Sequence, residues 1–207
     1  MENNYENNYI KSIDKGLRNS ISMIDSNITN SNVFFDSLVK LLKNTEKNNG
    51  NIYFFGNGAS ASFANHMALD WSKNGGILSF SLSDSSMLTE LANDYSYEEA
   101  FLEFLKINNP TEYDLVITTS SSGNSPNIVS VLEYCNKMNI NTLGFSGLKD
   151  DNKSVKLSKF SLYVPMKTYG MVECIHQVFH HLLLDKYMSV NEWEKLETQN
   201  MNSNNFQ

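Results

Sequence analysis

NIYFFGNGASASFANHMALD, residues 51–70, decides the fold class of this chain. The run from Ile52 to Phe55 is short and continuously apolar, which is typical of a strand buried on both faces of a sheet. A glycine-containing loop follows, and residues 60–74 then have the pattern of a helix that stops at Gly75-Gly76. Strand, loop and helix in this order form the unit from which parallel sheets are built.

The same alternation continues along the chain. Further buried strands are predicted at Ile77 to Leu82, Leu115 to Thr119, Thr142 to Ser146 and Phe160 to Val164. Helices are predicted at Ser85 to Ala92, Tyr97 to Lys106, Ser125 to Met138, around 150–157, and at 170–188. The pattern predicts an α/β fold, a three-layer sandwich in which a five-stranded parallel sheet is flanked by helices.

The two ends of the chain differ from this repeating part. Residues 8–45 carry apolar residues at helical spacing, with a break from Asn27 to Asn32, so two N-terminal helices are expected, with Ile21 and Ile24 in the first. Residues 191–207 are rich in Asn and poor in large apolar residues, and partial disorder is expected there. Residues 1–190 are predicted to form a single domain.

Composition excludes several classes of partner. The net charge of −7, with scattered Lys and Arg, argues against nucleic acid. The sequence shows no apolar stretch of membrane-spanning length and no signal peptide. Cys135 and Cys174 have neither metal nor redox spacing, so reduced thiols in a cytoplasmic protein are expected.

The loop after the third predicted strand, TTSSSGNSPN (Thr118 to Asn127), has five consecutive hydroxyl residues. Ser125 and Pro126 suit the start of a helix. Hydroxyls and free backbone N–H groups at a helix N-terminus form a site for a phosphate group. The alternative is an ordinary Ser-rich loop with a capped helix, but the position at the carboxyl end of an inner strand favours an anion site. A Walker loop is excluded because no Gly-Lys-Ser/Thr is present.

The loop after the first predicted strand superficially resembles a dinucleotide fingerprint. It fails at the third glycine position, which is Ala61, and no acidic ribose partner follows the second strand. Asn57 and Ser60 nevertheless offer hydrogen bonds that suit the hydroxyl groups of a ligand.

Histidines and carboxylates form a third group of candidates. His66 and Asp70 stand four residues apart and share one helix face. The last helix carries Glu173, His176, His180 and His181. Its apolar arc leaves Glu173 and His180 near the centre of the polar side and His176 and His181 near the borders. A divalent metal site, an acid–base pair and a helix with surface histidines all fit this pattern.

Together these residues resemble the sugar isomerase (SIS) domain family, in particular its branch that isomerises sedoheptulose 7-phosphate. Most of residues 50–185 takes part, in the right order and spacing, and SGNSPN with ANDY is the most specific match. The segments that carry the resemblance are IYFFGNGASASFANHMALD, LANDYSYEEAF, TTSSSGNSPNIVSVLEYCNKMNINTLGFSG and YVPMKTYGMVECIHQVFHHLL.

The resemblance implies a cytoplasmic homotetramer, with N-terminal helices (about 1–48) packed between subunits. It also implies aldose–ketose isomerisation of a phosphorylated sugar, such as sedoheptulose 7-phosphate to D-glycero-D-manno-heptose 7-phosphate, for lipopolysaccharide or capsule synthesis. A non-catalytic, phosphosugar-binding protein that regulates a partner is the alternative.

The resemblance also assigns roles to individual residues. The phosphate would be held by Ser120, Ser121, Ser122 and Ser125, and the sugar by Asn57, Ser60, Asp94 and Glu173. Asp70 would act as the base and His181 as the acid. One zinc ion would be bound by His66, Asp70, Glu173 and His181.

The chain departs from the family pattern at several of these positions. Asp70 replaces a Glu, and Glu173 replaces a Gln. Residues 168–171 lack the sugar-binding Asp and the Arg that the family has there, and Ala59 replaces a Gly. The differences cluster around the sugar and spare the phosphate loop, so the identity of the sugar is the open question.

Overall fold

The computed structural model describes residues 4–193 and contains a seven-stranded sheet in the order β2-β1-β7-β6-β5-β3-β4. Five strands are parallel: β3 (Ile52–Gly56), β4 (Ser79–Ser81), β5 (Leu115–Ser120), β6 (Asn141–Gly147) and β7 (Phe160–Val164). They coincide with the five predicted strands, which confirms the predicted α/β class and its parallel core.

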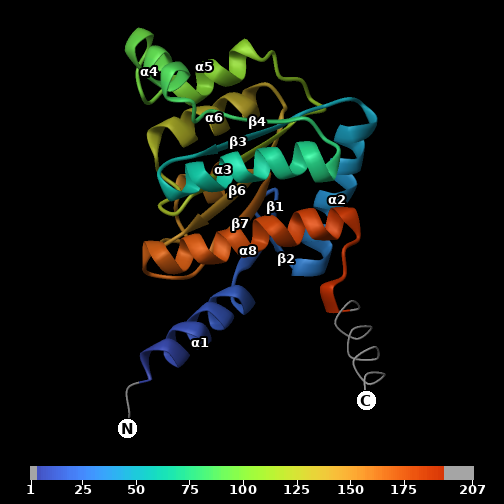
Figure 1. Cartoon of the computed structure of the whole chain (residues 1–207), viewed down its shortest axis with the longest axis vertical. Coiled ribbons are helices and arrows are strands. Elements are labelled where there is room, and N and C mark those ends of the chain that lie inside the picture. The colour runs from blue at the N-terminus through green and yellow to red at the C-terminus, as the bar shows by residue number, and fades with distance from the viewer. Residues whose placement is uncertain (1–3, 194–207) are drawn as a thin grey trace, which may run out of the picture.

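Helices cover both faces of this sheet (Figure 1). The elements of the first face are α2 (Ser31–Lys47), α3 (Ala59–Asp70), the π-helical turn η1 (Trp71–Gly75) and α8 (Tyr169–Met188). The elements of the second face are α4 (Ser85–Asp94), α5 (Ala100–Ile107), α6 (Pro126–Lys137) and α7 (Lys153–Leu157). Alternate residues of each strand point to opposite faces, so Ile52 and Phe54 enter the core under α2, α3 and α8, while Tyr53 and Phe55 pack under α5 and α6.

The N-terminal region departs from the prediction. Ile21 and Ile24 do not continue the first helix, α1 (Tyr5–Arg18), but bound the strand β1 (Ile21–Ile24), which pairs with β2 (Asn27–Thr29). Asp25 and Ser26 both have positive φ, as a two-residue hairpin turn requires. β1 also pairs antiparallel with β7, so sheet pairing outweighs the helical spacing of the two isoleucines.

Helix α1 extends away from the body of the molecule, and its C-terminal part lies near α8 (Figure 1). Most of the predicted Asn-rich tail, 194–207, lies outside the described residues. Within the described part of the chain, no helix combines the length and the apolar character that crossing a membrane requires.

Candidate functional site

A small polar pocket lies where β3 and β5 end. Its volume is about 130 Å³. Its lining consists of Asn57, Ser60, Thr119, Ser120, Ser121, Ser122, Ser125, Tyr169 and Glu173. The structure therefore brings the two predicted loops and the start of α8 together at the carboxyl end of the parallel strands, where ligands bind in open α/β sheets.

Backbone hydrogen bonds and a close contact with α7 fix the conformation of the hydroxyl-rich loop. The N–H of Gly123 donates to the backbone oxygen of Ser120 over 2.9 Å, and Gly123 has a φ of +63°. A side chain at this glycine would collide with Asn152, the residue that caps α7. The N–H of Ser154 in turn donates to the oxygen of Gly123. The loop is thus fixed before any ligand arrives, as an anion site made of N–H and hydroxyl groups requires.

Ser125 precedes α6 as predicted, with Pro126 as the first helical residue. Its side chain makes no capping hydrogen bond and instead lies 3.3 Å from the hydroxyl of Ser120. The hydroxyl of Ser121 is buried and has no partner among the described residues. These side chains therefore retain hydrogen-bonding capacity that a bound anion can use.

The loop after β3 is tied to α6 by two asparagines. The side chains of Asn57 and Asn127 exchange hydrogen bonds of 2.9 and 3.0 Å, and the hydroxyl of Tyr97 donates to Asn57 over 2.8 Å. Asn57 was predicted from the sequence, whereas Asn127 and Tyr97 were not. An Asn directly after the Ser-Pro helix start is the signal that could have drawn attention to Asn127.

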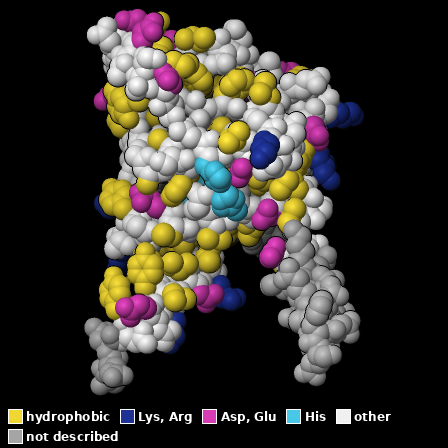
Figure 2. All heavy atoms as spheres, in the orientation of Figure 1, with side chains coloured by type: hydrophobic (Ala, Val, Ile, Leu, Met, Phe, Trp, Pro, Cys, Tyr) yellow, Lys and Arg dark blue, Asp and Glu magenta, His cyan; other side chains and the backbone are white. Residues whose placement is uncertain are grey.

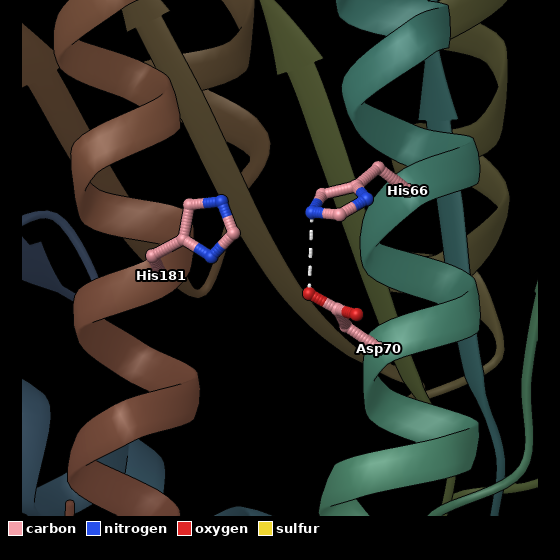
Figure 3. A group of neighbouring side chains, drawn as sticks. All are labelled: His66, Asp70 and His181. Atoms are coloured by element: carbon pink, nitrogen blue, oxygen red, sulfur yellow. Dashed lines mark ion pairs between the residues drawn. The ribbon is translucent and has the colours of Figure 1, made fainter.

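His66, Asp70 and His181 form a second cluster, between α3 and α8. Each offers one ligand atom, and these atoms lie within 4.8 Å of one another. His66 Nε2 is 3.2 Å from the carboxylate of Asp70, whose side chain also accepts from Asn74. Figure 3 shows the two α3 side chains and the His181 ring pointing toward each other across the gap between the helices. In Figure 2, histidine side chains reach the surface in the middle of this face.

The orientation of α8 corrects the expected position of two histidines. His180 is 2% exposed and His176 is fully buried, although His180 was placed on the polar side of the helix. His180 Nε2 lies 2.9 Å from the hydroxyl of Thr119, and His176 Nε2 lies 3.1 Å from the backbone oxygen of Ser146. Hydrogen bonds to the strand ends thus allow both rings to occupy the core.

Burial lowers the pKa of His176 to about 4 and that of His180 to about 3, with the neighbouring His176 and His181 adding to the shift at His180. Both rings are therefore neutral at physiological pH. The apolar residues Val178 and Leu182 of the same helix are, by contrast, 42% and 38% exposed.

The remaining predicted residues lie apart from this cluster. Glu173 lines the polar pocket and is not part of the three-residue group. Asp94 is exposed at the end of α4 and does not line the pocket. Gln177, which the sequence analysis did not consider, lies between Glu173 and His181 on α8, and its Nε2 is 2.7 Å from Nε2 of His181.

The donor set of the cluster suits a divalent metal. Two imidazoles and one carboxylate are the three protein ligands of a typical catalytic zinc site, which keeps a further position open for water or substrate. Because the three side chains already converge, an ion would need little rearrangement of the helices.

Comparison with known proteins gives consistent matches. The family model described as SIS domain matches residues 17–147. A phosphoheptose isomerase of Helicobacter pylori (strain Shi470) is 37% identical over 156 residues, which are 71% of this chain and 79% of that protein. A phosphoheptose isomerase of Paramagnetospirillum magneticum is 32% identical over 163 residues, 75% of this chain and 83% of that protein.

Solved structures agree on the fold. A phosphoheptose isomerase from Neisseria gonorrhoeae superposes with a TM-score of 0.75 at 22% identity, covering 90% of this chain and 96% of that one. The corresponding enzyme from Francisella tularensis also gives 0.75, at 17% identity. At these identities the superpositions bear on the fold alone.

Proposed function

The chain belongs to the SIS domain family and, within it, to the phosphoheptose isomerases, and from this premise we propose that it is an aldose–ketose isomerase that converts sedoheptulose 7-phosphate to D-glycero-D-manno-heptose 7-phosphate. The product would serve lipopolysaccharide or capsule heptose synthesis.

One observation carries the proposal: the polar pocket and the His66–Asp70–His181 cluster are joined by the same two helices. On α3, Ser60 lines the pocket and His66 lies six residues further on, a rise of about 9 Å at 1.5 Å per residue. On α8, Glu173 and His181 are separated by roughly 12 Å in the same way. A sugar chain of six or seven carbons, with bonds of about 1.5 Å, is comparable in length. A phosphate in the pocket would therefore leave the far end of the sugar near the cluster.

In this arrangement Ser120, Ser121, Ser122 and Ser125 hold the phosphate, and Asn57 and Ser60 contact the sugar hydroxyls. Asp94 and Glu173 complete the proposed sugar contacts. Asp94 would need α4 to approach the substrate, because it does not line the pocket.

We assign the proton transfers to Asp70 and His181. The Asp70 carboxylate removes the proton from the carbon next to the carbonyl, a cis-enediol forms, and the proton returns to the neighbouring carbon. His181 moves a proton between the two oxygens. His66, 3.2 Å from the Asp70 carboxylate, orients that carboxylate.

We further propose one zinc ion per subunit, held by His66, Asp70 and His181 with Glu173 as the fourth ligand. When bound, zinc would polarise the substrate carbonyl as a Lewis acid. The convergence of three ligand atoms within 4.8 Å supports the first three ligands. Glu173 would need a change of side-chain rotamer or the approach of substrate to join them.

We also propose a homotetramer in which residues 1–190 form one domain and α1 and α2 pack between subunits. Tyr5 and Ile10 on α1 are 68% and 66% exposed, and Val33 on α2 is 48% exposed. Burying such side chains is favourable, at about 25 cal/mol per Å² of apolar surface. Light scattering coupled to size exclusion would test this assembly.

For the compartment we propose the cytoplasm. Neither cysteine is paired within the described residues, and burial raises the pKa of Cys135 to about 12, as suits an unreactive thiol.

The test is incubation of the purified protein with sedoheptulose 7-phosphate, with and without a chelator, followed by detection of the aldose product. Asp70→Asn and His181→Ala are each expected to nearly abolish turnover and to leave the oligomer intact. Glu133→Gln on α6, an exposed carboxylate on the opposite face of the sheet, is the control and should keep wild-type rates.

Wild-type rates in Asp70→Asn or His181→Ala would refute the assigned roles. Tight binding of the sugar phosphate without product under any metal condition would refute the enzyme and favour a phosphosugar-binding regulator.

A further inference from the structure

Gln177 contacts His181, the proposed acid of the reaction, but belongs neither to the polar pocket nor to the three-residue cluster. Its Nε2 lies 2.7 Å from Nε2 of His181, one helical turn further along α8. The other end of the same amide, Oε1, is buried and has no hydrogen-bond partner among the described residues. Gln177 is half-buried, and the contact with His181 is the one side-chain hydrogen bond that its amide makes among the described residues, so it is a candidate for controlling that imidazole.

The contact restricts which nitrogen of His181 carries the proton. An amide nitrogen only donates, so with this amide orientation His181 Nε2 must accept and the ring proton resides on Nδ1. In that form Nδ1 is a proton donor and has no lone pair for a metal.

Rotating the Gln177 amide by half a turn exchanges its nitrogen and oxygen and so reverses the donor and acceptor roles in the contact with His181. Oε1 then accepts a proton from Nε2–H of His181, and the lone pair of Nδ1 becomes free. Amide nitrogen and oxygen have nearly the same shape, so the rotation needs no additional space. Each orientation leaves one end of the amide without a partner, so neither is strongly preferred by burial alone.

We propose that Gln177 is a positioning residue whose amide orientation sets the tautomer of His181. One orientation leaves Nδ1 of His181 protonated and able to donate, and the other leaves the lone pair of Nδ1 free for a divalent cation. The consequence for catalysis rests on the roles proposed for His181 above, whereas the effect on the tautomer does not.

Two substitutions at position 177 distinguish the effects of the two amide orientations. Gln177→Glu presents only oxygen, which can accept but not donate, and therefore fixes the Nε2–H tautomer with Nδ1 free. Gln177→Met has a similar size and removes both functions. Leu182→Glu adds the same charge at an exposed position of α8 that follows His181 directly and therefore does not face it, and is the matched control.

The first readout is the pair of ring ¹⁵N chemical shifts of His181, recorded in mildly alkaline buffer, where a free imidazole is neutral. The His181→Ala spectrum assigns the signals among the four histidines. We expect Gln177→Glu to show the Nε2–H tautomer, the wild type to move toward it when Zn²⁺ is added, and Gln177→Met to show a different tautomer balance from both.

The second readout is the affinity for Zn²⁺, measured by competition with a chromophoric chelator. Gln177→Met is expected to bind Zn²⁺ about 10- to 100-fold more weakly than Gln177→Glu, the range found when the hydrogen-bond partner of a metal-binding histidine is removed. Leu182→Glu should bind like the wild type.

Identical His181 ring shifts in the wild type, Gln177→Glu and Gln177→Met would overturn the inference, whatever the affinities. Equal gains in Zn²⁺ affinity for Gln177→Glu and Leu182→Glu would also contradict it, because charge alone would then explain the gain. Failure of the wild type to isomerise sedoheptulose 7-phosphate would refute the proposed function and leave the tautomer result standing.

Discussion

The buried imidazole of His176 predicts a measurable acid sensitivity of the fold. The ring is fully buried on α8, and its Nε2 donates to the backbone oxygen of Ser146, because a carbonyl can only accept. Its Nδ1 is buried without a partner among the described residues. Burial lowers the pKa from 6.5 to about 4, and the Ser146 contact opposes the shift only in part.

Because burial lowers the pKa of His176, the folded chain loses stability as the pH falls. The unfolded chain binds a proton at His176 below about pH 6.5, whereas the folded chain does not bind it until about pH 4. The stabilisation is thus present above pH 6.5 and is lost progressively as the pH falls toward 4. At 1.36 kcal/mol per pH unit, the loss between pH 6.5 and pH 5 amounts to roughly 2 kcal/mol for this one group.

His176→Gln tests the reasoning, since the amide of Gln can take the place of Nε2 and donate to Ser146 without titrating. Urea unfolding followed by circular dichroism, at equal protein concentration, gives the free energy of unfolding at pH 6.5 and at pH 5. The wild type should lose about 2 kcal/mol more than His176→Gln over this interval.

A matched variant separates titration from hydrogen bonding. His176→Asn also removes the titrating group, but its shorter side chain does not reach Ser146, so it should be less stable at both pH values by about 1–3 kcal/mol. An equal loss of stability in the wild type and His176→Gln between the two pH values would refute the account.

Three further predictions concern the polar pocket. Gly123→Ala should lower stability by at least 1–3 kcal/mol, measured by urea unfolding, because the residue has positive φ and its new side chain would meet Asn152; unchanged stability would mean that the loop can relax. Asn127→Ala removes two hydrogen bonds from Asn57 and should raise KM for the sugar phosphate about tenfold, with less effect on kcat. An unchanged KM in steady-state assays would contradict this prediction. Glu173→Gln removes a carboxylate from the pocket and should strengthen inhibition by inorganic phosphate by about tenfold, whereas unchanged inhibition would place the anion elsewhere.

Local patterns in the sequence were sufficient for the parallel core. β3 is a nearly continuous apolar run and β5 begins with one, and a glycine- or serine-containing loop follows each strand; both features are readable without the fold. The hairpin β1–β2 was missed because its turn, Asp25-Ser26, lacks the glycine that normally marks such turns, and because its strand pairs with β7, far away in the sequence.

The residues of the polar pocket were predictable where they lie in loops directly after a strand. His66, Asp70 and His181 were named from the sequence, but the choice of His181 over His180 came from the family resemblance. Periodicity failed there because a histidine can be buried once it has a hydrogen-bond partner, and the partner of His180 is Thr119, 61 residues away. Gln177 was missed for the same kind of reason, since its importance lies in a contact with His181 and not in a motif.

The positions at which this chain differs from its family affect the site to different degrees. Asp70 is one methylene shorter than the Glu of the family, yet its carboxylate lies within the group formed with His66 and His181, and α-helical geometry gives way to the π-helical turn η1 directly after it. The shorter side chain therefore does not remove the proposed base from the cluster. Glu173 and Tyr169, by contrast, line the pocket itself, where none of the nine lining residues is Lys or Arg. An anion held there depends on neutral donors beside a carboxylate, so we expect the changes at this end of α8 to alter substrate binding more than Asp70 does.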